Sequence, residues 1–369
     1  MKPAHRMAKI DASGIRKVFD LAANLKEPVN LSIGQPHYDV PEEVKEAAIA
    51  AIRDGKNGYT QTQGDPELRE RVRERLAESR GGWTGQELLI TSGTSGGIML
   101  ALLVTVDPGD EVVISDPYFV MYKHLVNLCG GTPVFLDTYP DFKIDPARLE
   151  EVITDRTKLV LFNSPNNPTG AVYTAEELAG IAAVLERRGV YAVSDEIYEF
   201  FCYDGEFRSL VEFYPERTLL LGGFSKTWSM TGWRLGYAAG PAGIVAEMTK
   251  LQQFSFVCAP SMVQYAGMAA LEVDPSDYRL QYRHKRDMIY EGLKTRFDVK
   301  KPGGAFYMFP EAPGGGESFV KRAIENGLLV IPGGVFSEKD THFRISYAAG
   351  DDTIARGIEV LNHLAETSC

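Results

Sequence analysis

A lysine and an arginine in the second half of the chain have the types and spacing to bind an aldehyde that carries a phosphate. Lys226 follows a predicted strand, Ser225 stands beside it, and Arg234 comes eight residues later. A lysine in a partly buried loop can lose its proton and form an imine with an aldehyde, while an arginine suits a phosphate. Because surface lysines are common, a surface loop with two unrelated cations is the alternative.

Three further polar segments each follow a predicted strand. Asp195 ends one strand and Tyr198 comes three residues later, a pattern that a helix cap would also give. The Asn-, Pro- and Gly-rich run 163–170 closes another strand and by composition alone would suit a plain turn. The Gly- and Ser-rich run 91–97 opens a helix, where free N–H groups and hydroxyls can surround an anion.

These segments are set in a regular alternation of strands and helices. Between about residues 85 and 240, short β-branched runs alternate with longer helical patterns, which predicts an α/β fold with a mostly parallel sheet. The predicted strands are 88–91, 111–115, 133–136, 158–162, 191–194, 218–221 and 235–238, and the predicted helices are 96–106, 121–128, 175–188 and 244–253. Because ligands of open α/β sheets bind at the carboxyl ends of the strands, we expect one shared site there.

The pattern changes after Ala270. A long charged helix over 278–297 and short strands near 303–309, 327–332 and 342–347 predict a smaller α+β domain. Apolar positions 15, 18, 19, 22 and 25 have helical spacing, and the extended piece 29–34 is expected to enter the cleft. We therefore expect a large domain over residues 40–275 and a small domain made of residues 1–39 and 276–369.

Composition excludes several classes of function. A net charge of −11 over 369 residues would repel a phosphate backbone, so nucleic acid is not an expected partner. The four cysteines are widely spaced and form no CxxC pair, so neither a metal site nor a disulfide framework is expected. No apolar stretch approaches the ~20 residues of a membrane span, and we expect a cytoplasmic protein without membrane contact.

Taken in order, these motifs resemble those of the fold-type I, pyridoxal-5′-phosphate (PLP) dependent aminotransferases, the class I/II family that includes aspartate and aromatic aminotransferases. The resemblance runs from about residue 30 to 350. It implies a mostly parallel seven-stranded sheet with helices on both faces, plus the smaller α+β domain. It also implies that Lys226 holds PLP as a Schiff base and that Arg234 binds the cofactor phosphate.

The resemblance assigns further residues to the cofactor ring. It implies that Asp195 pairs with the pyridine nitrogen, where a buried carboxylate would keep the ring protonated as an electron sink. Tyr198 and Asn167 would hydrogen-bond the 3′-oxygen. The stacking aromatic is Phe119 by the register of the motif, and Tyr118 is the alternative.

Other matched positions concern the phosphate. The family's phosphate-binding turn corresponds to Thr94 and Ser95. Many members carry Ser or Thr where this chain has Gly223, so that contact is lost unless Ser225 replaces it. Tyr59 matches a tyrosine that reaches the cofactor phosphate of the neighbouring subunit, which implies a homodimer with shared active sites.

The substrate positions complete the resemblance. Arg344 matches an arginine whose planar guanidinium grips the substrate α-carboxylate through two parallel hydrogen bonds. On its own, an alternating edge strand with an outward arginine would be the simpler interpretation. Gly34 lies in the segment that closes over substrate and permits close backbone approach, and Asn167 lies close to the same carboxylate.

The activity implied is ping-pong transfer of an amino group from an L-amino acid to a 2-oxo acid, with 2-oxoglutarate as the expected acceptor. Donors of the aspartate or aromatic type are favoured, but some aspartate-preferring relatives carry a lysine where this chain has Ser95, so the donor stays open. A cystathionine β-lyase-like C–S lyase is the nearest alternative. A non-catalytic PLP-binding regulator would need a DNA-binding domain ahead of Gly34, where only about thirty residues stand.

Overall fold

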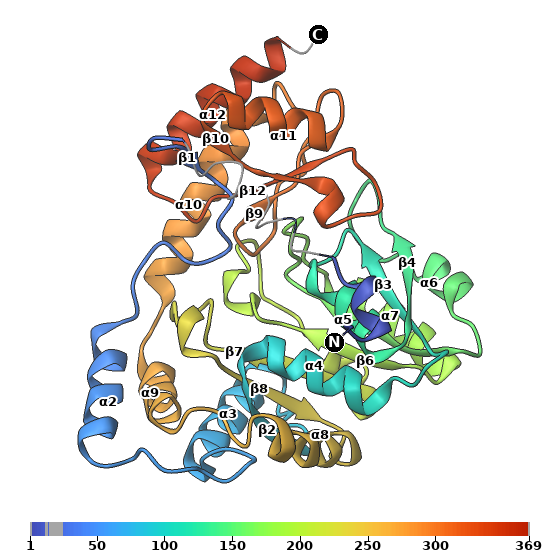
Figure 1. Cartoon of the computed structure of the whole chain (residues 1–369), viewed down its shortest axis with the longest axis vertical. Helices are drawn as coiled ribbons and strands as arrows, with labels where there is room; N and C mark the ends of the chain where they lie inside the picture. The colour runs from blue at the N-terminus through green and yellow to red at the C-terminus, as the bar shows by residue number, and fades with distance from the viewer. Residues whose placement is uncertain (1, 12–13, 15–24, 368–369) are drawn as a thin grey trace.

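The computed structural model describes residues 2–11, 14 and 25–367. Its main feature is a seven-stranded sheet with the order β2-β8-β7-β6-β5-β3-β4, in the lower half of Figure 1. Strand β8 is antiparallel to both of its neighbours, and all other neighbouring pairs are parallel. This confirms the predicted mostly parallel sheet. The strands are β2 (Glu87–Ser92), β3 (Glu111–Asp116), β4 (Thr132–Asp137), β5 (Thr157–Asn163), β6 (Tyr191–Asp195), β7 (Thr218–Gly223) and β8 (Leu235–Gly240).

Helices cover both faces of this sheet because successive strand residues point to opposite sides. Val112 and Ile114 pack with one set of helices, whereas Val113 between them packs with another. The first face carries α4 (Gly93–Thr105), α5 (Met121–Cys129) and α8 (Ala242–Ser255). The opposite face carries α2 (Glu42–Arg53), α3 (Pro66–Ser79), α6 (Pro146–Val152), α7 (Ala175–Arg188) and α9 (Ser261–Glu272).

Helix α7 shows why some boundaries could be predicted to the residue. Thr174 accepts a hydrogen bond from the N–H of Glu177, and the Glu177 carboxylate accepts one from the N–H of Thr174, which closes the first turn. The helix ends where Gly189 adopts a left-handed conformation at φ 65°. Local sequence therefore sets both ends of this helix.

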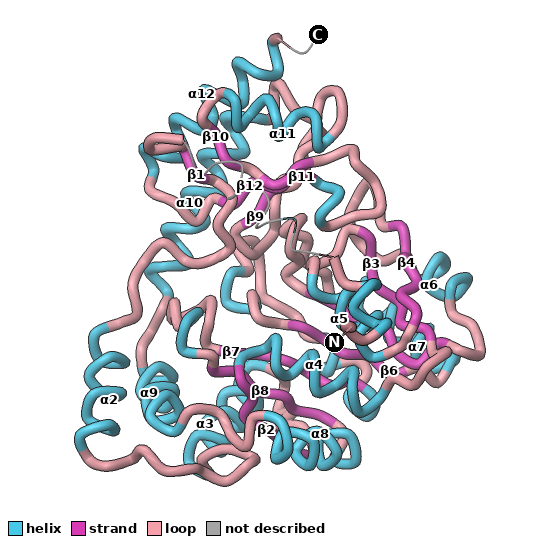
Figure 2. The backbone as a smooth tube through the Cα atoms, in the orientation of Figure 1, coloured by secondary structure: helices cyan, strands magenta, loops and turns pink. Residues whose placement is uncertain are grey.

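A second, smaller region lies above the large sheet in Figures 1 and 2. Its strands β11 (Ile331–Pro332), β12 (Phe343–Ser346) and β9 (Tyr307–Met308) form an antiparallel sheet with β12 in the middle. Near the N-terminus, β1 (Val29–Asn30) pairs with β10 (Leu328–Leu329), so distant segments of the chain meet here. A separate apolar cluster joins these strands to α10 (Ser276–Leu293), α11 (Gly316–Glu325) and α12 (Asp351–Glu366).

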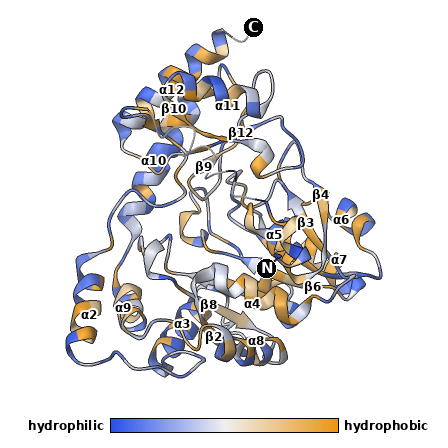
Figure 3. Cartoon of the chain, in the orientation of Figure 1, coloured by the Kyte–Doolittle hydropathy of each residue, from blue (hydrophilic) through white to orange (hydrophobic). Residues whose placement is uncertain are grey.

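The remaining elements are short. The 3-10 helices are η1 (His5–Lys9), η2 (Glu199–Phe201), η3 (Leu210–Glu212), η4 (Pro215–Arg217), η5 (Thr231–Trp233) and η6 (Gly333–Val335). Figure 3 shows that α2 and α12 carry both hydrophilic and hydrophobic residues, as helices on a protein surface do.

Within the described residues, no helix has the length and apolar character needed to cross a membrane. The helix predicted from apolar positions 15, 18, 19 and 22 lies outside the described residues.

Candidate active site

A cavity of about 280 Å³ is lined by segments at the carboxyl ends of the large sheet and by residues of β9 and β12. Parallel strands bring their carboxyl ends to one edge, which is why segments far apart in sequence meet here. All predicted site residues except Tyr59 line this cavity: Gly34, Thr94, Ser95, Phe119, Asn167, Asp195, Tyr198, Ser225, Lys226, Arg234 and Arg344.

Lys226 follows β7 and has an unusually acidic ammonium group. Its Nζ donates a hydrogen bond to the carbonyl oxygen of Gly34 at 2.6 Å, which ties the N-terminal segment to the large sheet. Burial and the charges of Arg344 and Arg234 together lower the pKa of Lys226 to about 8, although the charge of Asp195 acts in the opposite direction. A useful fraction of neutral amine is therefore available near neutral pH.

Asp195, the last residue of β6, is a buried carboxylate with two hydrogen-bond donors. The Tyr122 hydroxyl donates to Oδ2 at 2.7 Å, and the N–H of Ile197 donates to Oδ1 at 3.2 Å. Burial raises the pKa of Asp195 to about 6, although both hydrogen bonds and the charge of Lys226 act in the opposite direction. A positively charged group of a ligand placed next to Asp195 would stabilise the ionised form of this carboxylate.

Two tyrosine hydroxyls and an amide line the same cavity as this carboxylate. The hydroxyl oxygens of Tyr198 and Tyr307 are 2.9 Å apart. Burial raises the pKa of Tyr198 well above its ordinary value, so this residue stays protonated and can donate a hydrogen bond. Asn167 is placed by its N–H, which donates to Oδ1 of Asn163 at 2.9 Å.

Arg344 projects inward from the middle strand of the small sheet and is 1% exposed. Nη1 donates to Oδ1 of Asn167 at 3.1 Å and Nη2 to the carbonyl oxygen of Ser32 at 2.9 Å. The rings of Tyr307 and Phe336 lie 4.5 and 4.4 Å from the guanidinium carbon. Nε is buried and has no hydrogen-bond partner among the described residues, so a donor is left for a ligand. The edge-strand interpretation of this arginine is wrong.

The start of α4 forms a cradle because two glycines leave space there. A Cβ atom on Gly93 would lie 2.6 Å from Nη2 of Arg234, and one on Gly223 would lie 2.9 Å from Oγ1 of Thr94. Gly93 also has φ 69°, which favours glycine. The departure from the usual Ser or Thr at position 223 thus has a steric reason: Thr94 occupies the space where that side chain would start.

Phe119 and Tyr118 point in different directions. Tyr118 is fully buried, donates from its hydroxyl to Oε1 of Glu338 at 2.6 Å, and stacks on Phe135 at 5.2 Å between ring centroids. Phe119 lines the cavity and meets Tyr122 edge to face at 5.6 Å. Of the two aromatics, Phe119 is therefore the one that a ligand in the cavity can contact.

Gly34 and Tyr59 differ in their relation to the cavity. A Cβ atom on Gly34 would lie 2.7 Å from the hydroxyl oxygen of Tyr307, so a larger residue would push into the cavity wall. Tyr59 is 85% exposed and lies beside a surface hollow that also includes Lys56 and Tyr265. Within one chain, Tyr59 is not part of the cavity.

Several residues of the cavity were not predicted: Ser32, Ile33, Ile98, Tyr122, Asn163, Ile197, Thr231 and Tyr307. Tyr122 had a weak signal, because it lies at the start of the predicted helix 121–128, only three residues after Phe119. Tyr307 had none, since an aromatic residue in an apolar strand is ordinary core. Among the described residues, no group of His, Cys, Asp and Glu side chains could hold a metal ion.

Comparison with known proteins extends over nearly the whole chain. Residues 26–361 match the family model described as aminotransferase class I and II. The chain is 38% identical to the "Probable aspartate aminotransferase" of Methanocaldococcus jannaschii, over 98% of this chain and 99% of that protein. It is 35% identical to the "Aromatic-amino-acid aminotransferase 2" of Thermococcus litoralis, with 97% of each covered. The solved aspartate aminotransferase of Thermus thermophilus with maleate superimposes with a TM-score of 0.94 at 34% identity, covering 99% of this chain and 100% of that one.

Proposed function

The chain belongs to the class I and II aminotransferase family, and on this premise we propose a substrate class and a role for each residue of the cavity. The protein is a PLP-dependent aminotransferase that acts on amino acids and 2-oxo acids. We propose that the donor is an L-amino acid of the aspartate or aromatic type, that the acceptor is 2-oxoglutarate, and that the two react in turn by a ping-pong mechanism.

The donor set of the cavity fits the cofactor. One end has the glycine-lined cradle at the start of α4, with Arg234 beside it, which suits a phosphate. The same cavity has the Asp195 carboxylate, whose raised pKa of about 6 favours a cationic partner such as a pyridinium nitrogen. Lys226 lines the same cavity with its lowered pKa of about 8. This combination in one cavity is the observation that carries the proposal.

We assign the phosphate to Thr94, Ser95, Ser225 and Arg234. Backbone N–H groups at the start of α4 add to these donors, and the positive end of the helix dipole favours the anion. Ser225 supplies a hydroxyl that Gly223 cannot. This assignment is supported by the position of all four side chains on the cavity wall.

We assign the ring to the neighbouring side chains. Asp195 holds the ring nitrogen in its protonated form, and Tyr122 keeps the carboxylate oriented through its hydroxyl. Tyr198 and Asn167 donate to the 3′-oxygen, and Phe119 covers one face of the ring. When bound, the cofactor supplies an electrophilic carbon and an electron-withdrawing ring that stabilises charge at the substrate Cα.

Lys226 and Arg344 would then act on the substrate itself. Arg344 binds the α-carboxylate through its unpaired Nε and a neighbouring N–H, and this orients the Cα–H bond toward the cavity. Lys226 holds the cofactor until substrate arrives, and its released neutral amine takes the Cα proton. Gly34, whose carbonyl oxygen already accepts from Lys226, lets the N-terminal segment approach closely.

The residues that line the cavity place fewer limits on the side chain of the substrate than on its α-carboxylate. Among the described residues that line the cavity, the cations are Lys226, Arg234 and Arg344, and each has a role above. A second carboxylate on the substrate would need a cation from beyond these residues, which is why aromatic donors stand beside aspartate in the proposal.

We further propose a homodimer in which Tyr59 reaches the phosphate of the neighbouring subunit. Tyr59 is 85% exposed and lines a surface hollow together with Phe256, which is 41% exposed, and neighbouring exposed apolar groups of this kind can mark an interface. We also propose a large domain over residues 40–275 and a small domain made of 1–39 and 276–369. A cytoplasmic location is proposed as well, and the wide spacing of the four cysteines, with no CxxC pair, supports it.

The test is a panel of amino donors offered to the PLP-loaded enzyme with 2-oxoglutarate. We expect glutamate to form with aspartate or with an aromatic amino acid, and no product to form without the oxo acid after one turnover. Continuous release of pyruvate from a β-substituted amino acid without an acceptor would instead support the lyase alternative.

A further inference from the structure

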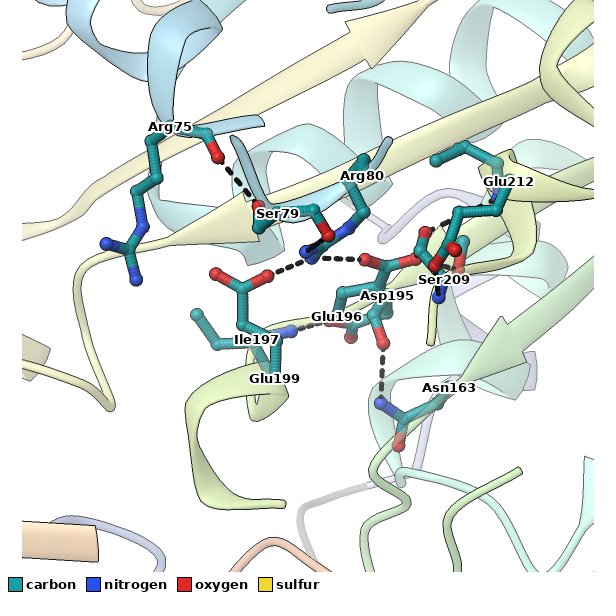
Figure 4. Close-up of polar contacts among 12 residues, drawn as sticks. Arg75, Ser79, Arg80, Asn163, Asp195, Glu196, Ile197, Glu199, Ser209 and Glu212 are labelled. Atoms are coloured by element: carbon teal, nitrogen blue, oxygen red, sulfur yellow. Dashed lines mark hydrogen bonds and ion pairs between the residues drawn. The ribbon is translucent and has the colours of Figure 1, made fainter. Parts of the chain in front are cut away.

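Arg80 lies outside the cavity, directly after α3, yet it is only 3% exposed. Its Nη2 group forms ion pairs with Glu196, at 2.9 Å, and with Glu199. Glu196 is 1% exposed. Figure 4 shows the two carboxylates pointing toward Arg80, and none of the three residues lines the cavity. We call them the buried ionic triad.

The triad lies behind a segment whose other face forms the cavity wall. Asp195, Ile197 and Tyr198 line the cavity, whereas Glu196 and Glu199 turn away from it toward Arg80. Each glutamate is therefore the immediate neighbour of a residue that we assign to the cofactor ring. Arg80, 116 positions before Glu196 in the chain, fixes the back of this segment at two points.

Glu196 is also fixed on its second oxygen. The hydroxyls of Ser194 and Ser209 donate to Oε1 at 2.9 and 2.5 Å, while Oε2 accepts from Arg80. In a low-dielectric interior such bonds are strong, and the carboxylate cannot rotate without breaking several of them together. The network therefore restrains the orientation of the Glu196 side chain from three directions.

Stability alone does not account for the triad. Burying charges is costly, and replacing a buried ion network with well-packed uncharged residues is often neutral or stabilising. Burial acts to raise the pKa of Glu199, but the attraction of Arg80 and Arg75 outweighs it and leaves that pKa lowered. Glu199 thus remains charged, and a single nitrogen of Arg80, Nη2, contacts both carboxylates.

We propose that Arg80 is a positioning residue for the aminotransferase reaction, because its bridge between Glu196 and Glu199 fixes the segment that presents Asp195 and Tyr198 to the cofactor. The inference rests on the roles proposed above for Asp195 and Tyr198. A displacement of about 1 Å at reacting groups can cost roughly a hundredfold in rate, so loss of the bridge affects kcat.

The experiment removes the bridge without leaving unpaired charges. Arg80→Met alone would leave two buried carboxylates unpaired and could unfold the protein, so the decisive variant is R80M/E196Q/E199Q. We expect it to fold, with kcat reduced roughly 10- to 100-fold. We also expect the 15N resonance of the ring nitrogen of labelled, bound PLP to move toward the unprotonated position. A milder variant, Glu199→Gln, keeps the Arg80–Glu196 pair and should show a smaller loss in kcat with a smaller change in the resonance.

Arg286 offers a control in a second ion network, in which the arginine is buried while the side chains of Asp204 and Asp287 are 51% and 40% exposed. It is 1% exposed, pairs with Asp204 at 2.5 Å and Asp287 at 2.9 Å, and does not line the cavity. The variant R286M/D204N/D287N should lower the melting temperature while kcat and the 15N resonance stay at wild-type values. A change that is specific to the Arg80 variants would therefore reflect positioning and not loss of stability.

Wild-type kcat together with an unchanged 15N resonance in R80M/E196Q/E199Q would overturn the proposal and leave Arg80 a structural residue. If that variant does not fold, the test depends on Glu199→Gln alone. A wild-type kcat and an unchanged 15N resonance in Glu199→Gln would then overturn the proposal. A wild-type enzyme that forms no product with any donor of the panel would instead overturn the proposed function, so the two failures are distinguishable.

Discussion

The two walls of the cavity differ in what their charged groups can do. The large-sheet wall carries Asp195 and Lys226, whose pKa values of about 6 and about 8 lie close to neutral pH. The small-sheet wall carries Arg344, which is packed between two rings. Burial lowers the pKa of Arg344 from its ordinary value, but an arginine keeps its proton in proteins.

This difference indicates that the two walls have different roles in the reaction. Groups that titrate near neutral pH can hold or move protons, and we assign these tasks to the large-sheet wall. A permanently charged, planar group with fixed neighbours can only bind and orient, and we assign this task to the small-sheet wall. Changes to the two walls should therefore give different kinetic and pH signatures, ordered below from the largest expected effect to the smallest.

Lys226→Ala should have the largest effect, because it removes the only group on the large-sheet wall that we expect to take the Cα proton. We expect no measurable turnover, with weak PLP binding retained through the phosphate and ring contacts. Absorbance and dialysis would measure the binding, and coupled assays the turnover. Retention of the wild-type absorption spectrum in this variant would show that another residue holds the cofactor.

Asp195→Asn should come next. A neutral amide cannot hold the proton on the ring nitrogen, so deprotonation of the substrate Cα should slow by at least about a hundredfold, within the range of a lost acid–base contribution. Single-turnover kinetics with Cα-deuterated donor would measure this step. The fold should be retained, because the amide keeps the size of the side chain. A deprotonation rate near that of wild type would contradict the assigned role.

Arg344→Ala tests the small-sheet wall and should weaken kcat/KM for every donor and acceptor. Each charge-assisted hydrogen bond contributes about 1.5–3 kcal/mol, so the loss of two predicts at least a hundredfold or so. Arg344→Lys should also be poor, since a lysine lacks the planar fork. The informative measurement compares amino acids with their decarboxylated amines. If the alanine variant prefers the acids as strongly as wild type does, the carboxylate is bound elsewhere.

Tyr122→Phe should have the smallest effect and should depend on pH. The hydroxyl stabilises the Asp195 carboxylate, so its removal should raise the pKa of Asp195 further above its ordinary value. Below that pKa the carboxyl is protonated and cannot bind a cation, so PLP affinity falls as pH falls. We expect the midpoint of this fall to move upward by roughly one pH unit, with little change at pH 8.5 or so. Titration of the apoenzyme with PLP between about pH 5 and 9 would measure the midpoint, and an unmoved midpoint would exclude this role for Tyr122.

The large-sheet wall could be predicted well because its residues follow strands directly. Asp195 ends β6 and Lys226 comes shortly after β7, so the alternation of strands and helices already placed them at one edge. Gly223 was recognised as a departure, but its reason required the distance to Thr94 in the folded chain. The boundaries of α7 matched because its caps are local, whereas short strands such as β9 depend on partners far along the chain.

The small-sheet wall and the support behind the cavity depended on contacts that no local pattern records. The alternating sequence around Arg344 does not distinguish an edge strand from a middle strand. Only the pairing of β12 with β9 and β11 decided that the guanidinium is buried. Arg80 likewise stands at the end of an ordinary charged helix, and only folding brings it to Glu196.

The sequence by itself predicted the fold class, and the family resemblance of its motifs predicted most residues of the cavity, because these motifs lie within a few positions of each strand. Only the tertiary structure decided which aromatic of the pair Tyr118 and Phe119 faces the cavity and that Tyr122 reaches Asp195. It also decided that Tyr59 lies apart from the cavity within one chain. The physical reason is that side-chain direction, burial and hydrogen-bond partners depend on elements packed from distant parts of the chain, and so do the pKa values that follow from them.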